Sequence, residues 1–160
     1  MMFRKFHIDS EIRKREKEWS EFDGNEFSIR KDGDNRTAGN FAEMVFQKLY
    51  PHALRISDVD KNADFVLRKK RIDVKTKVRT VPAALDFEAS VEARQRFYDC
   101  DFYCFFSYDR IASVLEYCGW ISKNEFFSKA RLISRGDSEG SNNWIASVDC
   151  YQLPYSSLNR

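Results

Sequence analysis

The spacing of apolar side chains changes along the chain, and these changes predict a mixture of helices and strands. A helix over residues 37–49 is expected because its apolar positions follow the i, i+3, i+4, i+7 spacing of a helix that packs on a core. These positions are Ala42, Val45, Phe46 and Leu49. Pro51 lies just past the end of this helix, where a proline stops it. A charged, solvated helix is expected before it, over residues 9–21.

The centre and the C-terminal part read mostly as strands. The expected strands are 54–56, 63–68, 71–78, 102–106, 114–121 and, at a sheet edge, 144–151. The run FYCFF at 102–106 is continuously apolar, as in a buried strand. Two readings remain open after Pro82, because 85–91 is compatible with an extended segment and 88–98 with a helix. A short helix over 124–130 is expected, with Ser122 as its cap and Glu125 at the third position.

These elements predict one α/β domain over residues 1–160, with a core at about 37–130 and a helical N-terminal extension over 1–33. Fourteen phenylalanines argue against a disordered chain, which is usually poor in aromatic residues. No apolar run approaches the roughly 20 residues that span a bilayer, so no membrane partner is expected. The first residues also lack the apolar region of a secretory signal, which favours a cytoplasmic protein.

The few histidines and cysteines restrict the chemistry of any metal site. His7 and His52 lie far apart, and the four cysteines contain no Cys-x-x-Cys pair. A structural zinc site is therefore not expected, and the cysteines are interpreted as reduced, mostly buried thiols. If the protein is an enzyme, carboxylates and lysines must carry its reaction.

The most informative segment is residues 64–77, which predicts a β-hairpin with a two-residue turn at Lys69-Lys70. With this turn Leu67 lies opposite Ile72 and Phe65 lies opposite Val74, so that one face of the hairpin is wholly apolar. A slip of one residue would divide these four side chains between the two faces, so burial favours the predicted register.

The other face of the hairpin collects charged side chains. Asp64 is expected directly opposite Lys75, and Asp73 lies beside Lys75 on its own strand and diagonal to Asp64. The plain alternatives are an ordinary exposed Asp73–Lys75 pair, worth under about 1 kcal/mol, and a turn role for Asp64. Two carboxylates on one half-buried face offer the hard oxygen ligands that Mg²⁺ prefers. A lysine beside them is suited to stabilising the charge of a phosphate transition state.

These residues resemble the signature of the PD-(D/E)xK nuclease superfamily. Asp64, eight intervening residues and then Asp73-Val74-Lys75 match an acidic residue followed by (D/E)xK across a hairpin, with Ala63 in place of the proline. Nucleases of this group often add a Glu from an upstream helix, and Glu43 matches that place at the edge of the apolar stripe. The alternative for Glu43 is a solvated helix residue.

The resemblance implies a restriction-endonuclease-like fold, with a central mixed β-sheet flanked by helices in the order α-β-β-β-α-β. It implies a nuclease that hydrolyses phosphodiester bonds in DNA with Mg²⁺, for which Mn²⁺ substitutes. Asp64, Asp73 and Glu43 would hold the metal and Lys75 would stabilise the transition state. Many such nucleases act as homodimers, and the lack of a separate specificity domain favours cutting at junctions, flaps or nicks. Some carry a Gln on the helix after the (D/E)xK strand, which points to Gln95; its alternative is an exposed polar residue.

The overall charge of +2 conceals a basic segment. Residues 61–80 hold eight Lys or Arg against two Asp, so the remaining residues are acidic on balance. Phosphate neutralisation supplies most non-specific affinity for nucleic acid, so this segment favours a polyanion partner. Lys69 and Lys70 at the turn and Lys77 and Arg79 along the strand are the expected phosphate contacts. A hydrophilic turn would by itself explain Lys69 and Lys70.

Two alternatives to a nuclease stay open. The first is a catalytically silent nucleic-acid-binding module of the same fold, although such a module has no need of paired carboxylates. The second is a small scaffold that binds a partner through aromatic side chains of the C-terminal part. These side chains are Trp120, Trp144, Tyr151 and Tyr155.

Overall fold

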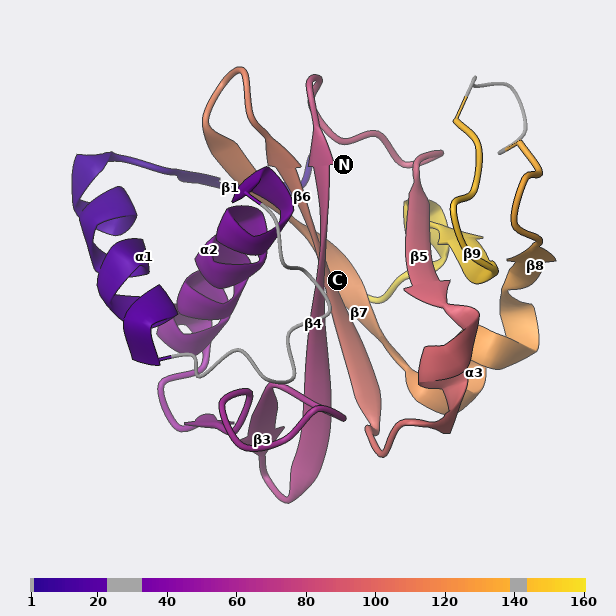
Figure 1. The fold of residues 1–160 in the computed structure, drawn as a ribbon, viewed down its shortest axis with the longest axis horizontal. Coiled ribbons are helices and arrows are strands. Elements are labelled where there is room, and N and C mark those ends of the chain that lie inside the picture. Colours follow the sequence, from indigo (N-terminus) through magenta and orange to yellow (C-terminus); the bar gives the residue numbers. More distant parts are fainter. Residues whose placement is uncertain (1, 23–32, 139–143) are drawn as a thin grey trace.

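The computed structural model describes residues 2–22, 33–138 and 144–160, and residues 23–32 of the expected N-terminal extension lie outside this part (Figure 1). Its centre is a mixed six-stranded sheet in the order β1-β7-β6-β4-β3-β2. The strands are β1 (Arg4–His7), β2 (Leu54–Arg55), β3 (Phe65–Leu67), β4 (Lys70–Arg79), β6 (Phe102–Asp109) and β7 (Val114–Ser122). β4 and β6 are parallel, and the other neighbours are antiparallel.

The predicted aromatic strand lies in the middle of this sheet as β6, between β4 and β7. Its side chains alternate between two apolar clusters on opposite faces, with Tyr103 and Phe105 in one and Cys104 and Phe106 in the other. A strand that is covered on both faces needs apolar residues at every position. This explains why FYCFF is a continuous run, and the prediction of a buried strand is confirmed.

Two helices cover one face of the sheet, α1 (Ser10–Phe22) and α2 (Gly33–Leu49), which lie side by side in Figure 1. The predicted apolar stripe of α2 is buried against the sheet. α2 begins at Gly33 rather than at residue 37, so the helix is longer than the apolar pattern alone indicates. The expected helical extension over 1–33 contains α1, but its first residues form β1, which pairs with β7.

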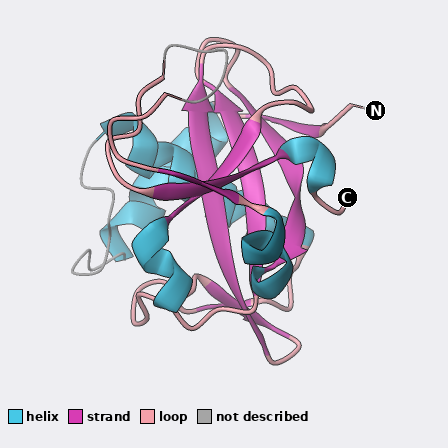
Figure 2. Cartoon of the chain, turned by 90° about the vertical axis from the view of Figure 1, so that its right-hand side faces the viewer, coloured by secondary structure: helices cyan, strands magenta, loops and turns pink. Residues whose placement is uncertain are grey.

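A second, smaller sheet and the helix α3 (Lys123–Lys129) cover the opposite face. Figure 2 views the molecule from this side, with the small sheet crossing in front of the long central strands. The sheet has the order β5-β9-β8, with β5 (Glu88–Glu92), β9 (Cys150–Pro154) and β8 (Arg131–Ile133). The Ser122 hydroxyl accepts a hydrogen bond from the Glu125 amide at 3.2 Å, which confirms the predicted cap of α3.

Two expectations for this second layer differ from the structure. Residues 88–98 form β5 and then a short 3₁₀ helix (Ala93–Phe97), so an α-helix does not follow β4 as the expected element order requires. The expected edge strand at 144–151 is displaced to Cys150–Pro154, where β9 is the central strand of its sheet. Pairing on both sides of β9 explains its buried side chains, which the sequence pattern near the chain end did not indicate.

The hairpin β3–β4 differs in register from the prediction by two residues. Phe65 pairs with Ile72, and the turn residues are Arg68 and Lys69, with φ angles of 50° and 63°. Positive φ at both central residues is typical of the tight turns that match the twist of a hairpin. Because side chains repeat every two residues, this shift leaves every residue on its predicted face. It does bring Asp64, rather than Val66, level with Asp73.

Candidate active site

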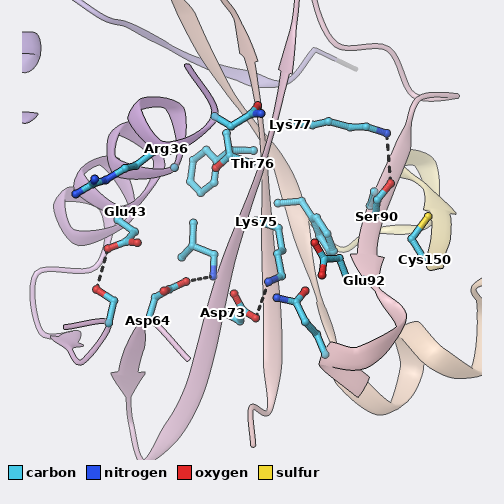
Figure 3. Close-up of a pocket in the computed structure, with 18 of the residues that line it drawn as sticks. Arg36, Glu43, Asp64, Asp73, Lys75, Thr76, Lys77, Ser90, Glu92 and Cys150 are labelled. Carbon is cyan, nitrogen blue, oxygen red and sulfur yellow. Dashed lines mark hydrogen bonds and ion pairs between the residues drawn. The ribbon is translucent and has the colours of Figure 1, made fainter. Parts of the chain in front are cut away.

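A cavity of about 480 Å³ lies along β4, at the sheet edge that the short strand β3 leaves open. It extends from α2 on one face of the sheet to β5 and β9 on the other (Figure 3). Six of the residues singled out from the sequence line it together: Glu43, Asp64, Asp73, Lys75, Lys77 and Gln95. The structure therefore brings residues from α2, the hairpin and the segment after β5 to one place.

Asp64 precedes β3 and is fixed to β4 by two hydrogen bonds. Its backbone amide donates to the Ile72 carbonyl at 2.9 Å, and its carboxylate Oδ2 accepts from the Val74 amide at 2.7 Å. Burial raises the pKa of Asp64 well above its usual range, and the negative charges of Glu43 and Asp73 raise this pKa further. Lys75 and the Val74 amide act in the opposite direction. Burial and the neighbouring carboxylates thus outweigh Lys75 and the Val74 amide in their effect on the pKa of Asp64.

Asp73 and Lys75 form an ion pair on one face of β4, with Lys75 Nζ 2.8 Å from Asp73 Oδ2. Their side chains are only 10% and 12% exposed, which rules out an ordinary pair on a solvated strand. On the neighbouring strand β6 they lie beside Tyr103 and Phe105. Removing two charges from water to such a place is costly. The pair is thus no typical surface salt bridge, and both side chains line the cavity.

Glu43 projects from α2 into the same cavity, and it is not a solvated helix residue. Its Oε2 accepts hydrogen bonds from Arg55 Nε at 3.2 Å and from the Ser57 hydroxyl at 3.1 Å. The Arg55 guanidinium in turn lies over the Trp19 ring, 4.2 Å from its centroid. α1, α2 and the strand β2 thus hold this carboxylate on the α2 side of Asp64, as Figure 3 shows.

The donor set is compatible with a magnesium ion held by two residues rather than by a cage. Among the described residues, no group of three or more His, Cys, Asp or Glu side chains is arranged to hold a metal. Glu43 is engaged by Arg55 and Ser57. Mg²⁺ is usually bound through one or two carboxylates, with water and substrate phosphate as the remaining ligands. Asp64 and Asp73 are the two carboxylates that could hold such an ion, and Glu43 lies close enough to influence Asp64 electrostatically.

Gln95 lies in the 3₁₀ helix after β5 and lines the cavity with a buried side chain. The alternative of an exposed polar residue on a helix surface is therefore wrong. The 3₁₀ helix connects β5 to the start of β6, so Gln95 lines the cavity from the side of the small sheet.

The predicted basic residues separate into two groups. Lys77 lines the cavity, and its Nζ donates to the Ser90 hydroxyl at 3.3 Å. Arg79 lies behind the cavity, where its guanidinium stacks on Phe87 at 4.4 Å from the ring centroid. Lys69 and Lys70 are exposed at the far end of the hairpin and do not line the cavity. Of these four side chains, Lys77 alone is placed beside the acidic residues.

The sequence interpretation missed several residues of this cavity. They are Arg36, Thr76, Ser90, Glu92 and Cys150, whereas Trp144 was named only as an aromatic side chain of the alternative partner-binding scaffold. A signal for two of them was present, because Glu88–Glu92 alternates polar and apolar residues and so predicts one polar face on β5. Arg36 and Trp144 carry no such signal, since they come from the first turn of α2 and from an irregular segment before β9.

Comparison with known proteins gives no identification of this chain. No family model matches it, and no curated protein matches it. Within the described residues, no helix is both long and apolar enough to cross a membrane.

Proposed function

We propose that this protein is a metal-dependent nuclease that hydrolyses phosphodiester bonds in DNA, with a restriction-endonuclease-like core. The observation that carries the proposal is the meeting of Asp64, Asp73 and Lys75 in one cavity at the open edge of β4. The mixed sheet with helices on both faces is compatible with the proposed core. The parallel pairing of β4 with β6 also places the (D/E)xK strand in the middle of that sheet.

In this proposal Asp64 and Asp73 hold Mg²⁺, and Glu43 assists directly or through a water molecule. The ion supplies a Lewis acid for the scissile phosphate and lowers the pKa of a bound water. Binding of a cation would relieve the repulsion that raises the pKa of Asp64. Asp73 holds the Lys75 ammonium in place at 2.8 Å, so that this cation can stabilise the negative charge that develops on the phosphate. Gln95 is available to orient the substrate or a water from the opposite wall.

Two finer features belong to the proposal. The first is a preference for junctions, flaps or nicks, because the lysines that line the cavity suit phosphate contacts, which fix position but carry no sequence information. The second is assembly as a homodimer, which would place two such cavities on the two strands of a duplex.

The test is cleavage of linear, nicked, flapped and four-way DNA by the purified chain with Mg²⁺ or Mn²⁺. Asp73→Asn and Lys75→Met should reduce cleavage to the level of an EDTA control. Glu43→Gln should cost only about 10- to 100-fold, as is typical of a residue that acts through a metal's outer partners. Lys70→Met is the matched control, since Lys70 lies on the same strand outside the cavity. Cleavage that persists in Asp73→Asn and Lys75→Met would contradict the proposal.

A binding module without turnover is the second candidate, and one observation favours it. Asp73 and Lys75 neutralise one another, and Glu43 is held by Arg55 and Ser57, so the charges already have partners in the absence of a metal. This candidate expects salt-sensitive DNA binding with no cleavage of any of the four substrates. Metal-stimulated cleavage that is lost in Asp73→Asn would exclude it.

A further inference from the structure

The end of the cavity away from Asp64 combines a lysine with an exposed aromatic ring. Lys77 reaches from β4 toward Ser90 on β5 (Figure 3), and its Nζ lies 5.1 Å from the centroid of the Trp144 ring. Trp144 also lines the cavity and is 38% exposed. A tryptophan in this position presents an aromatic surface to anything that enters the cavity beside Lys77.

The strand geometry sets the distance between this ring and the acidic residues. Asp73, Lys75 and Lys77 share one face of β4 at alternate positions. With a rise of about 3.3 Å per residue, the Cα atoms of Lys75 and Lys77 are about 6.6 Å apart. This is comparable with the separation of neighbouring phosphates along a nucleic-acid strand. A strand with one phosphate at Lys75 therefore has its next phosphate at Lys77 and a base beside Trp144.

We propose that Trp144 stacks an unpaired base of the substrate, while Lys77 binds the adjoining phosphate, so that the protein acts on single-stranded segments. This inference rests on the proposed function and names its substrate class. Every base has a flat aromatic face on which a tryptophan can stack, but in a duplex both faces are covered by neighbouring base pairs. A cavity of about 480 Å³ is also of the size that holds a small ligand such as a nucleotide.

The existing contact between Lys77 and Trp144 is compatible with the entry of a base. A cation over an exposed aromatic ring is a weak interaction, and stacking of a base is the stronger one. Entry of a base would displace the ammonium from the ring. A phosphate one step along the strand would then contact Lys77 beside Ser90.

The chain contains a matched control in Trp120. Its side chain is 39% exposed, nearly the same fraction as that of Trp144. Trp120 lies on β7, packs edge to face against Phe102 at 5.6 Å between centroids, and does not line the cavity. A substitution at Trp120 therefore removes a similar aromatic surface from a different part of the molecule.

The experiment measures binding of a labelled single-stranded oligonucleotide and of the corresponding duplex by anisotropy, in EDTA so that no cleavage occurs. Trp144→Ala should weaken single-strand binding by about 5- to 150-fold, the loss expected for one stacked base. It should change duplex binding by less than about twofold. Trp144→Phe should keep most of the single-strand affinity, because it retains an aromatic face, and Trp120→Ala should bind as the wild type does.

Three other outcomes would contradict the stacking site. Unchanged single-strand binding by Trp144→Ala, an equal loss in Trp120→Ala, or no single-strand binding by the wild type would overturn the inference. In all three cases Mg²⁺-dependent cleavage of duplex substrates would still support the proposed nuclease. Conversely, a loss specific to Trp144→Ala without any cleavage in Mg²⁺ would support the stacking site and contradict the nuclease.

Discussion

The Asp64 carboxylate accepts a hydrogen bond from the backbone amide of Val74 at 2.7 Å. This bond satisfies an amide of β4 beyond the last residue that β3 pairs, and it holds the carboxylate beside Asp73. A single side chain thus substitutes for a missing strand neighbour and contributes to the acidic site.

This relationship separates two roles of Asp64 that substitutions can distinguish. Asp64→Asn keeps an oxygen acceptor for the Val74 amide but removes the charge that Glu43 and Asp73 repel. We expect it to unfold at a urea concentration at least as high as the wild type does. Asp64→Ala leaves the amide without this acceptor and should lower the free energy of unfolding by about 1–3 kcal/mol. Both variants should lose cleavage.

Equal destabilisation by the two variants would contradict this separation. It would mean that the negative charge itself, rather than the hydrogen bond to Val74, stabilises the edge of β4.

The turn of the β3–β4 hairpin gives a test of its register. Lys69 has a φ of 63°, a conformation that costs a side chain with a Cβ about 1 kcal/mol and costs glycine nothing. Lys69→Gly should therefore raise the free energy of unfolding by about 1 kcal/mol in urea titrations. Lys70→Gly is the control, because Lys70 is a strand residue paired with Leu67, and glycine there should destabilise the protein.

If Lys70→Gly stabilised the protein instead, the turn would lie at Lys69-Lys70. Asp64 would then face Lys75 rather than Asp73, and the acidic site would be arranged differently.

The four buried cysteines predict the behaviour of the protein in alkali. Burial is the largest cause that raises the pKa of Cys100 to about 11 and that of Cys118 to about 12. In the unfolded chain such thiols ionise near pH 8.5. Because the folded-state pKa is the higher one, their stabilising contribution is complete below about pH 8.5. It is lost as the pH rises through the folded-state values.

Urea titrations should therefore show a constant cysteine contribution up to about pH 8.5 and a falling free energy of unfolding above it. At pH 8 a thiol reagent should modify the native protein far more slowly than the protein in denaturant. Equal modification rates in the two states would contradict the burial of these thiols.

Individual helices and strands show what a local sequence pattern can and cannot predict. The apolar stripe of α2 and the buried strand β6 were predicted correctly, because burial on one side or on both leaves a clear periodicity. The Ser122 cap was likewise readable, since it depends on residues three positions apart. β1 and β9 were missed or displaced, because each is defined by pairing with a strand far away in the sequence.

Some features of the candidate site were likewise predictable from the sequence, and others were not. The two-residue period of a strand was sufficient to predict that Asp73 and Lys75 share a face, and the (D/E)xK spacing drew attention to Asp64. The sequence did not indicate that Arg55 and Ser57 hold Glu43, or that Ser90 and Trp144 close the other end of the cavity.

The sequence by itself determined which residue types lie on each face of the hairpin, since the alternation of a strand is a local property that survives even a register error of two residues. Only the tertiary structure decided that Asp64 lies level with Asp73, and that α2, β4 and β5 surround one cavity. These relationships depend on two apolar clusters that bury opposite faces of the same sheet. Burial is shared among segments distant in the chain, so no local pattern specifies the partners that it brings together.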